Sequence, residues 1–262
     1  MTSPSGSQRI DPEAPAGGPG PVLLDLQPPV DRTVVPPLTE QTRAEVRETI
    51  ARYPKPRSAL LPMLHLVQSV QGYVSPDGIR LCAEELGLTK AEVGAVATFY
   101  TMYRRRPAGQ YHVGVCTNTL CAVLGGDEIL EALEEHTGLH HDQTSADGMI
   151  SLEHIECNAA CDYAPVVMVN WEFHDDQTPQ SAVELVDRLR AGEPVAPTRG
   201  PRTQCTFKEM SRVLAGFPDG RATEGVQAGP ATLAGLALAQ QRGDSAPDFP
   251  AAPPAGTPDQ ES

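Results

Sequence analysis

Residues 111–136, YHVGVCTNTLCAVLGGDEILEALEEH, contain the pattern that decides the fold. Apolar side chains alternate with small or polar ones from Tyr111 to Val115, which predicts a β-strand that ends at Cys116. A helix is then predicted as far as about His136, because its apolar residues recur at helical spacing and its glutamates face outward. A strand that places a cysteine at its end is typical of open α/β sheets, whose active groups gather at strand ends.

Four cysteines occur as two close pairs, Cys116 with Cys121 and Cys157 with Cys161. Thiolates hold soft metal centres, so metal ligation is the leading explanation. C-x4-C with C-x3-C can hold a structural zinc, although C-x2-C is more usual, or a [2Fe–2S] cluster, which needs two thiolates per iron. Disulfides are the explanation without metal, and the lack of an apolar export signal at the N-terminus counts against them. The spacing alone leaves zinc and iron–sulfur open.

The remaining elements of this domain follow from the same periodicities. Strands are predicted near 149–155, 166–169 and 171–174, and Thr178-Pro179 begins a final helix through Arg190. The resulting order is strand, helix, three strands and helix. It places all four cysteines in loops at strand ends.

The segment 38–106 is predicted to form a small bundle of helices joined by short turns. Its first three helices begin at side chains that can cap them, Thr39, Ser58 and Ser75. Thr89 and Glu92 form a capping box for a short fourth helix. No residue in this bundle suggests chemistry of its own.

Both ends of the chain are rich in proline. Nine of the 26 prolines lie within the first 37 residues, and ten more lie from Pro194 to Pro258. Residues 1–37 are therefore predicted to be a flexible tail, and residues 192–262 a low-complexity, mostly disordered tail, on either side of domains at 38–106 and 107–191. Within the second tail, RTQCTFKEMSRVLAGF (202–217) has helical amphipathicity, and it is expected either to fold on a partner or to stay disordered.

Three segments resemble one known family: VATFYTMY from Val96, CTNTLCAVLGGDEILEAL from Cys116 and ECNAACDYAPVVMVNWEF from Glu156. They closely resemble the E subunit of bacterial NADH-quinone oxidoreductase, respiratory complex I, and the resemblance runs from about residue 38 to 189. It implies an α+β protein, with a small helical bundle followed by a thioredoxin-like α/β domain that has a mixed sheet.

The resemblance also implies the cofactor and its ligands. One [2Fe–2S] cluster would be held by Cys116, Cys121, Cys157 and Cys161. The sequence departs from the family at Asn158-Ala159-Ala160, where relatives often have a glycine. The extra methyl group there is expected to crowd the turn between the second pair of ligands.

The function that the resemblance implies is electron transfer without a substrate pocket. The cluster would exchange single electrons with the FMN of a neighbouring subunit that binds NADH, and an iron–sulfur-rich subunit would be a second partner. The chain would be catalytically incomplete alone and would lie in the cytoplasm, in the peripheral arm on the inner face of the plasma membrane. An equivalent subunit of an NAD-linked hydrogenase or formate dehydrogenase is one alternative, and a zinc-stabilised interaction module is another.

The segment between Arg106 and Arg188 contains fifteen acidic residues and no Lys or Arg. Negative charge around a thiolate-ligated cluster disfavours the incoming electron, so a low-potential one-electron centre is predicted. A redox potential above that of free NADH would contradict this prediction. Nucleic acid is an unsuitable ligand for so acidic a surface. No apolar run reaches the roughly 20 residues that a membrane span needs, so direct membrane insertion is not expected.

Several other residues have simpler expected roles. Cys82 is predicted to be a small core residue and Cys205 a free thiol in the tail. Arg104-Arg105-Arg106 is expected to pair with acids inside the chain or on a partner. The histidines are assigned to surface or packing, and Trp171 and Tyr163 to core or rim. Four residues in the cysteine loops are candidates to hydrogen-bond to sulfur: Thr117, Asn118, Thr119 and Asn158.

Overall fold

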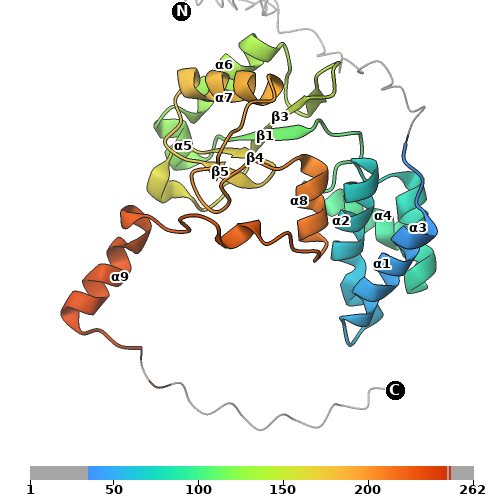
Figure 1. The fold of residues 1–262 in the computed structure, drawn as a ribbon. Helices are drawn as coiled ribbons and strands as arrows, with labels where there is room; N and C mark the ends of the chain where they lie inside the picture. The colour runs from blue at the N-terminus through green and yellow to red at the C-terminus, as the bar shows by residue number, and fades with distance from the viewer. Residues whose placement is uncertain (1–34, 247, 249–262) are drawn as a thin grey trace, which may run out of the picture. The chain divides into compact units, whose positions relative to one another are not determined.

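The computed structural model describes residues 35–246 and residue 248. Its N-terminal part is helical: α1 (Glu40–Ala51), α2 (Leu60–Gln71), α3 (Pro76–Leu86) and α4 (Lys90–Phe99) (Figure 1). The caps predicted for α1, α3 and α4 are confirmed, because Thr39 accepts from the Thr42 N–H, Ser75 accepts from the Gly78 N–H, and Thr89 forms a capping box with Glu92. Most of the predicted tail 1–37 lies outside the described residues.

The cap predicted at Ser58 is wrong. Residues Pro56–Ala59 form a 3-10 helix, η2, and α2 begins directly after it with Ala59 as an N-cap that makes no side-chain bond. Pro56 at the first position of η2 starts the tight turn two residues earlier than expected, because its fixed φ suits a helical start. The predicted end of α2 at Gly72 is confirmed.

Helix α2 is buried around most of its circumference. Its fully enclosed side chains are Met63, Leu64, Leu66, Val67 and the polar Gln68 that follows them. A surface helix buries one stripe, so a helix that is buried all round must have partners on opposite sides. Helices α1, α3 and α4 cover one side of α2, and α8 (Phe207–Leu214) covers another.

The second part of the fold is a five-stranded mixed sheet. Its strands are β1 (Tyr111–Cys116), β2 (Gln143–Thr144), β3 (Ile150–Ile155), β4 (Val167–Val169) and β5 (Glu172–His174), and their order across the sheet is β2-β3-β1-β4-β5. Strands β1 and β3 are parallel, and every other neighbouring pair is antiparallel. The predicted mixed sheet is confirmed, and the two-residue β2 was not foreseen.

Helices α6 (Gly126–Thr137) and α7 (Pro179–Arg190) lie side by side against the sheet (Figure 1). Their apolar faces supply Ile129, Leu133, Leu185 and Leu189 to a core shared with β1, β3 and β4. Charged side chains lie on the opposite face, as the helical periodicity requires. The sheet and these two helices form two packed layers, and the cysteine loops extend from the strands of this sheet.

The chain beyond residue 191 differs from the expected disordered tail. It contains α8, the 3-10 helix η4 (Arg221–Thr223) and α9 (Pro230–Arg242). Thr206 and Glu209 form a capping box for α8, and Phe207 is fully buried with its ring centroid 5.2 Å from that of Trp171. Residues 192–246 are therefore largely folded, while residues 247 and 249–262 lie outside the described part. The domain boundaries at 106/107 and 191/192 stay a prediction.

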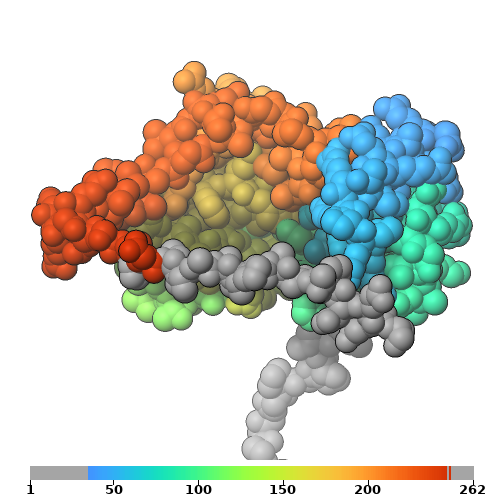
Figure 2. All heavy atoms as spheres, turned by 90° about the horizontal axis from the view of Figure 1, so that it is seen from below, coloured from blue at the N-terminus to red at the C-terminus, as the bar shows by residue number. Residues whose placement is uncertain are grey.

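The C-terminal segment, residues 192–244, joins the two parts of the fold. Figure 2 shows it in orange and red, running along one face of the sheet region toward the blue helices. The Gln68 amide of α2 donates to Ser211 Oγ of α8 at 3.3 Å, and Arg212 of α8 pairs with Glu45 of α1 at 2.9 Å. Within the described residues, no helix is both long and apolar enough to span a bilayer.

Candidate metal centre

The first cysteine pair lies where β1 turns into the helical layer. Cys116 is the last residue of β1, and Cys121 lies in a short helix, α5 (Thr119–Val123). The single helix predicted to run to His136 is thus two helices. Gly125, at φ +110°, interrupts the helical backbone between α5 and α6. Such a φ is readily adopted only by glycine.

The second pair follows β3. Cys157 lies in the loop after β3, and Cys161 begins the 3-10 helix η3 (Cys161–Tyr163). Their sulfur atoms are 3.8 Å apart. Because β1 and β3 are parallel neighbours, with Cys116 paired with Ile155, both cysteine runs leave the sheet at the same edge. The two predicted pairs of ligands therefore lie at the same end of the sheet.

Contacts between the two loops hold them together. The Asn118 amide donates to Glu156 Oε2 at 2.8 Å, and the Cys116 N–H donates to the Val166 carbonyl oxygen at 3.2 Å. Beneath the loops, Cys116 and Cys121 pack with Ala160 and Val166 in a small apolar cluster. Sequence reasoning missed the roles of Glu156 and Val166, because neither residue type suggests a ligand loop.

The four thiols differ in exposure. Cys116 and Cys121 are only 2% and 3% exposed, whereas Cys157 and Cys161 are at the surface. Burial raises the pKa of the Cys121 thiol to about 11, although the Val166 backbone opposes this shift. The hydrogen bond with Cys157 raises the pKa of Cys161. Thiols with raised pKa values hold their protons at neutral pH, so a metal must displace those protons when it binds.

The donor set suits a cluster ligated by sulfur. All four cysteines are free thiols, and the Ala159 N–H donates to Cys157 Sγ at 3.3 Å. The Asn158 amide nitrogen is buried and has no hydrogen-bond partner in the described structure, so it is available to a sulfur acceptor. Among the described residues, no three His, Cys, Asp or Glu side chains converge as ligands of one ion. The cysteines stand as two pairs, which is the ligand arrangement that a two-iron cluster uses.

The turn at residues 158–160 is strained, as the departure from the family pattern suggested. Ala159 has φ +54°, a left-handed conformation that costs a residue with a Cβ roughly 1–2 kcal/mol. Glycine adopts it without that cost. The strain comes from the backbone conformation of Ala159.

Arg104 supplies positive charge to one side of the sheet edge. It pairs with Glu153 at 2.8 Å and also with Asp142, and His112 Nε2 lies 2.9 Å from the same Glu153 oxygen. The expected pairing of the basic run with acids inside the chain is thereby observed for Arg104. Burial lowers the pKa of His112, so this imidazole is neutral at pH 7.

The other cysteines and histidines lie apart from the four thiols. Cys82 is enclosed in the helical core as predicted, and burial raises its pKa to about 12. Cys205 is a free thiol but is buried beside Glu172, not exposed in a tail. The rings of His141 and His154 lie against each other on β3 and the preceding turn, with centroids 4.2 Å apart.

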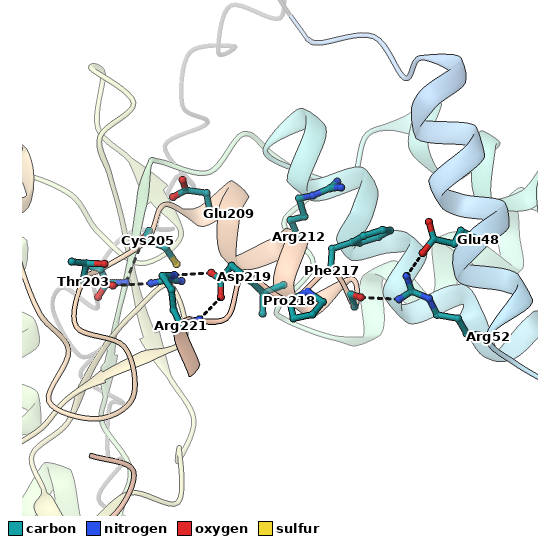
Figure 3. Close-up of a pocket in the computed structure, with 13 residues that line it drawn as sticks. Glu48, Arg52, Thr203, Cys205, Glu209, Arg212, Phe217, Pro218, Asp219 and Arg221 are labelled. Atoms are coloured by element: carbon teal, nitrogen blue, oxygen red, sulfur yellow. Dashed lines mark hydrogen bonds and ion pairs between the residues drawn. The ribbon is translucent and has the colours of Figure 1, made fainter. Parts of the chain in front are cut away.

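A separate cavity of about 800 Å³ lies between α1 and the segment from α8 to η4 (Figure 3). Arg52 enters it from α1 and donates to the Gly216 carbonyl oxygen, while Arg221 pairs with Asp219 and donates to the Thr203 carbonyl oxygen. Its arginines thus already bind carboxylates or backbone carbonyl oxygens of this chain. The cavity contains none of the four candidate ligands.

Comparison with known proteins identifies the fold and its cofactor class. The family model for the thioredoxin-like [2Fe-2S] ferredoxin matches residues 46–190. This chain belongs to the thioredoxin-like [2Fe-2S] ferredoxin family. Membership implies a [2Fe–2S] cluster, and it confirms the predicted family and fold class.

Relatives of this ferredoxin extend the match to most of the chain. The E subunit of NADH-quinone oxidoreductase from Mycobacterium tuberculosis is 57% identical over 245 residues, which cover 88% of this chain and 96% of the relative. The E 2 subunit of the same enzyme from Rhizobium meliloti is 33% identical over 153 residues, or 58% of this chain and 91% of the relative. The solved structure of a thioredoxin-like [2Fe-2S] ferredoxin from Aquifex aeolicus is 26% identical, with a TM-score of 0.28, and covers 34% of this chain and 87% of its own.

Proposed function

We propose that this ferredoxin is the [2Fe–2S] electron-transfer subunit of an NADH-quinone oxidoreductase, respiratory complex I. The proposal is supported by two pairs of free thiols at one end of the sheet, Cys116 with Cys121 and Cys157 with Cys161, in a chain that is 57% identical to the E subunit of such an enzyme. A bound [2Fe–2S] cluster would supply a site for one electron at a time. The oxidoreductase activity belongs to the assembly, because this chain is catalytically incomplete alone.

The residues around the proposed cluster have different roles. Buried Cys116 and Cys121 exclude water on one side, and the exposed Cys157 and Cys161 form the rim through which an electron would leave or enter. The Ala159 N–H, already directed at Cys157 Sγ, and the Asn158 amide would donate to thiolate or sulfide. Such hydrogen bonds stabilise the added negative charge of the reduced state.

The partner proposed for the rim is the subunit that binds FMN and NADH, with the iron–sulfur-rich subunit as a second neighbour. Leu120, Val123 and Leu124 are exposed on and just after α5, beside the first cysteine pair. Phe99 and Tyr100 are exposed at the end of α4. Exposed apolar residues that cluster in this way mark protein interfaces. We place this subunit on the cytoplasmic face of the plasma membrane, held in the peripheral arm by these partners.

Metal and sulfide analysis tests the proposed cluster. Anaerobically purified protein should contain iron and acid-labile sulfide at about two of each per chain, with visible absorption that bleaches on reduction. Cys116→Ser and Cys157→Ser should each lose that absorption, whereas Cys205→Ala should keep it, because Cys205 lies away from the four thiols. Stoichiometric zinc without sulfide would contradict the electron-transfer function and would instead support a zinc-stabilised interaction module.

Purification of the intact assembly tests the proposed partners. A tagged chain should bring down subunits that bind FMN and NADH together with a quinone-reducing membrane arm. Val123→Asp should weaken that recovery, since it introduces a charge into the exposed apolar group, and Val226→Asp, at another exposed valine, should not. Recovery of a nickel–iron or formate-oxidising subunit would assign the chain to a hydrogenase or formate dehydrogenase instead.

A further inference from the structure

One arginine from the C-terminal segment lies at the loop that carries Cys161. Arg199 Nε and Nη2 donate to the two oxygens of Asp175 at 2.7 and 2.9 Å, and Nη2 also lies 3.2 Å from Asp162 Oδ1. Asp162 directly follows Cys161 in the sequence. The thioredoxin-like domain has no Lys or Arg between positions 106 and 188, so this positive charge reaches the ligand loop from a distant part of the chain.

Arg199 is fixed by more than its ion pairs. Its guanidinium lies 5.1 Å from the ring centroid of Tyr163 and 5.4 Å from that of Phe173, which are cation–π distances. The preceding Thr198 donates its N–H to the Phe173 carbonyl oxygen at 2.9 Å and its hydroxyl to Asp175 at 2.8 Å. The arginine side chain is 17% exposed, so solvent screens its charge only partly.

The start of α9 holds the same loop from a second direction. The Ala231 N–H donates to the Tyr163 hydroxyl oxygen at 3.2 Å, and the Thr232 hydroxyl donates to Asp162. A side chain at Gly229 would collide with the Tyr163 hydroxyl, so the backbone there approaches as closely as it can. The two residues after Cys161 are thus bound on both sides by the C-terminal segment.

We propose that Arg199 is a positioning residue that orders the Cys161 loop and raises the midpoint potential of the cluster above the value that the acidic domain alone would set. The inference rests on the proposed cluster site. Without the guanidinium, Asp162 and Asp175 would keep only the hydroxyl donors Thr232 and Thr198 and would lack a positively charged partner. Their negative charge would disfavour the incoming electron.

Three variants separate charge from position. Arg199→Gln removes the charge and both ion pairs; Arg199→Lys keeps the charge but cannot bridge two carboxylates in the same way. Arg188→Gln is the matched control, since Arg188, on α7, makes an exposed ion pair with Glu193 in the segment after this helix. EPR-monitored redox titration measures the midpoint potential of the full-length protein, and amide hydrogen exchange over residues 157–163 measures loop order in the same samples with and without metal.

We expect Arg199→Gln to lower the midpoint potential and to speed exchange in the loop, while Arg188→Gln matches wild type in both. In Arg199→Lys, the amide hydrogens of the loop should exchange fast, but the midpoint potential should stay nearer to that of wild type. Asp162→Asn provides a test of opposite sign, because losing one carboxylate should raise the potential even if Arg199→Gln folds poorly. Equal potentials in wild type, Arg199→Gln and Asp162→Asn would overturn the inference. Wild-type protein without iron and sulfide would instead overturn the proposed function.

Discussion

The carbonyl oxygen of Cys116 leaves no room for a side chain at Gly126. A Cβ atom at Gly126 would lie 2.5 Å from that oxygen and 2.9 Å from the backbone of Cys121. Helix α6 therefore begins directly against the turn that carries Cys116 and Cys121, the first pair of proposed ligands. The close approach fixes the position of this turn relative to the helix behind it.

Gly126→Ala should destabilise the protein by about 1–3 kcal/mol, because the added methyl forces the ligand turn away from α6. Gly94→Ala is the matched control: Gly94 lies in α4, and the space around its Cβ position is open. In that helix, alanine should gain roughly 0.5–1 kcal/mol over glycine. Urea unfolding of both variants measures the difference. Equal stability of the two would show that the ligand turn can move freely.

Ala159→Gly should stabilise the loop between Cys157 and Cys161. The left-handed backbone at Ala159 costs roughly 1–2 kcal/mol with a Cβ present, and the greater freedom of glycine in the unfolded chain offsets part of the gain. A net increase of about 0.5–1 kcal/mol in the free energy of unfolding is expected. Ala160→Gly is the control, since Ala160 has φ −106° and is buried. That change should cost stability, and a gain there would contradict the explanation.

Phe207→Ala should be among the most damaging changes outside the ligand set. Phe207 is fully buried and its ring lies beside those of His112 and Trp171, so its removal should cost about 3–5 kcal/mol. Phe99→Ala removes the same group from a site that is 78% exposed and should change stability by less than about 0.5 kcal/mol. Thermal unfolding compares the two. A small effect of Phe207→Ala would mean that α8 does not stay docked in solution.

Acid should weaken the folded state through His65. Burial lowers the pKa of His65 to about 4, whereas an unfolded histidine titrates near 6.5. The unfolded chain therefore binds more protons between these values. The stabilising contribution of neutral His65 is fully present above about pH 6.5 and falls by about 3 kcal/mol as the pH drops to 4.

His65→Gln removes this titration, so the dependence of the free energy of unfolding on pH should become shallower between pH 6.5 and 4 than in wild type. Comparing the two proteins at each pH cancels the acid sensitivity of the cluster itself. His112 and His174, whose pKa values burial also lowers, contribute to the slope that remains. Identical slopes would show that His65 is solvated in the folded state.

The elements that the sequence predicted well are those determined by short-range chemistry. The side chains of Thr39, Ser75 and Thr89 bond to backbone groups three residues ahead, so the residues that form these caps are visible in the sequence. The cap predicted at Ser58 was wrong because Pro56 allowed the helical turn to start earlier. Two competing local signals for a helix start cannot be ranked from the sequence alone. The two cysteine runs leave the sheet at one end because β1 and β3 are parallel neighbours; the sequence predicted that the cysteines lie at strand ends, but not that these two strands pair.

The docking of α8 and the contact of Arg199 with the ligand loop were not predicted. The amphipathic pattern of residues 202–217 shows that a helix with one apolar face can form there, but not which surface it covers. The available signal lay in α2, whose apolar residues Leu60, Met63, Leu64, Leu66 and Val67 exceed what one packing face requires. Contacts such as Arg199 with Asp162 depend on where the segment crosses the sheet, and residue types do not fix that path.

The dependence of α2 on α8 has a consequence for synthesis on the ribosome. Domains are made from the N-terminus and usually fold as they emerge. Here the side of α2 that packs against α8 has no cover until translation has passed residue 214. The nascent helical region must therefore expose apolar surface through most of elongation. Nonsense or frameshift products that end before α8 should be aggregation-prone, even when they retain every cysteine of the two pairs.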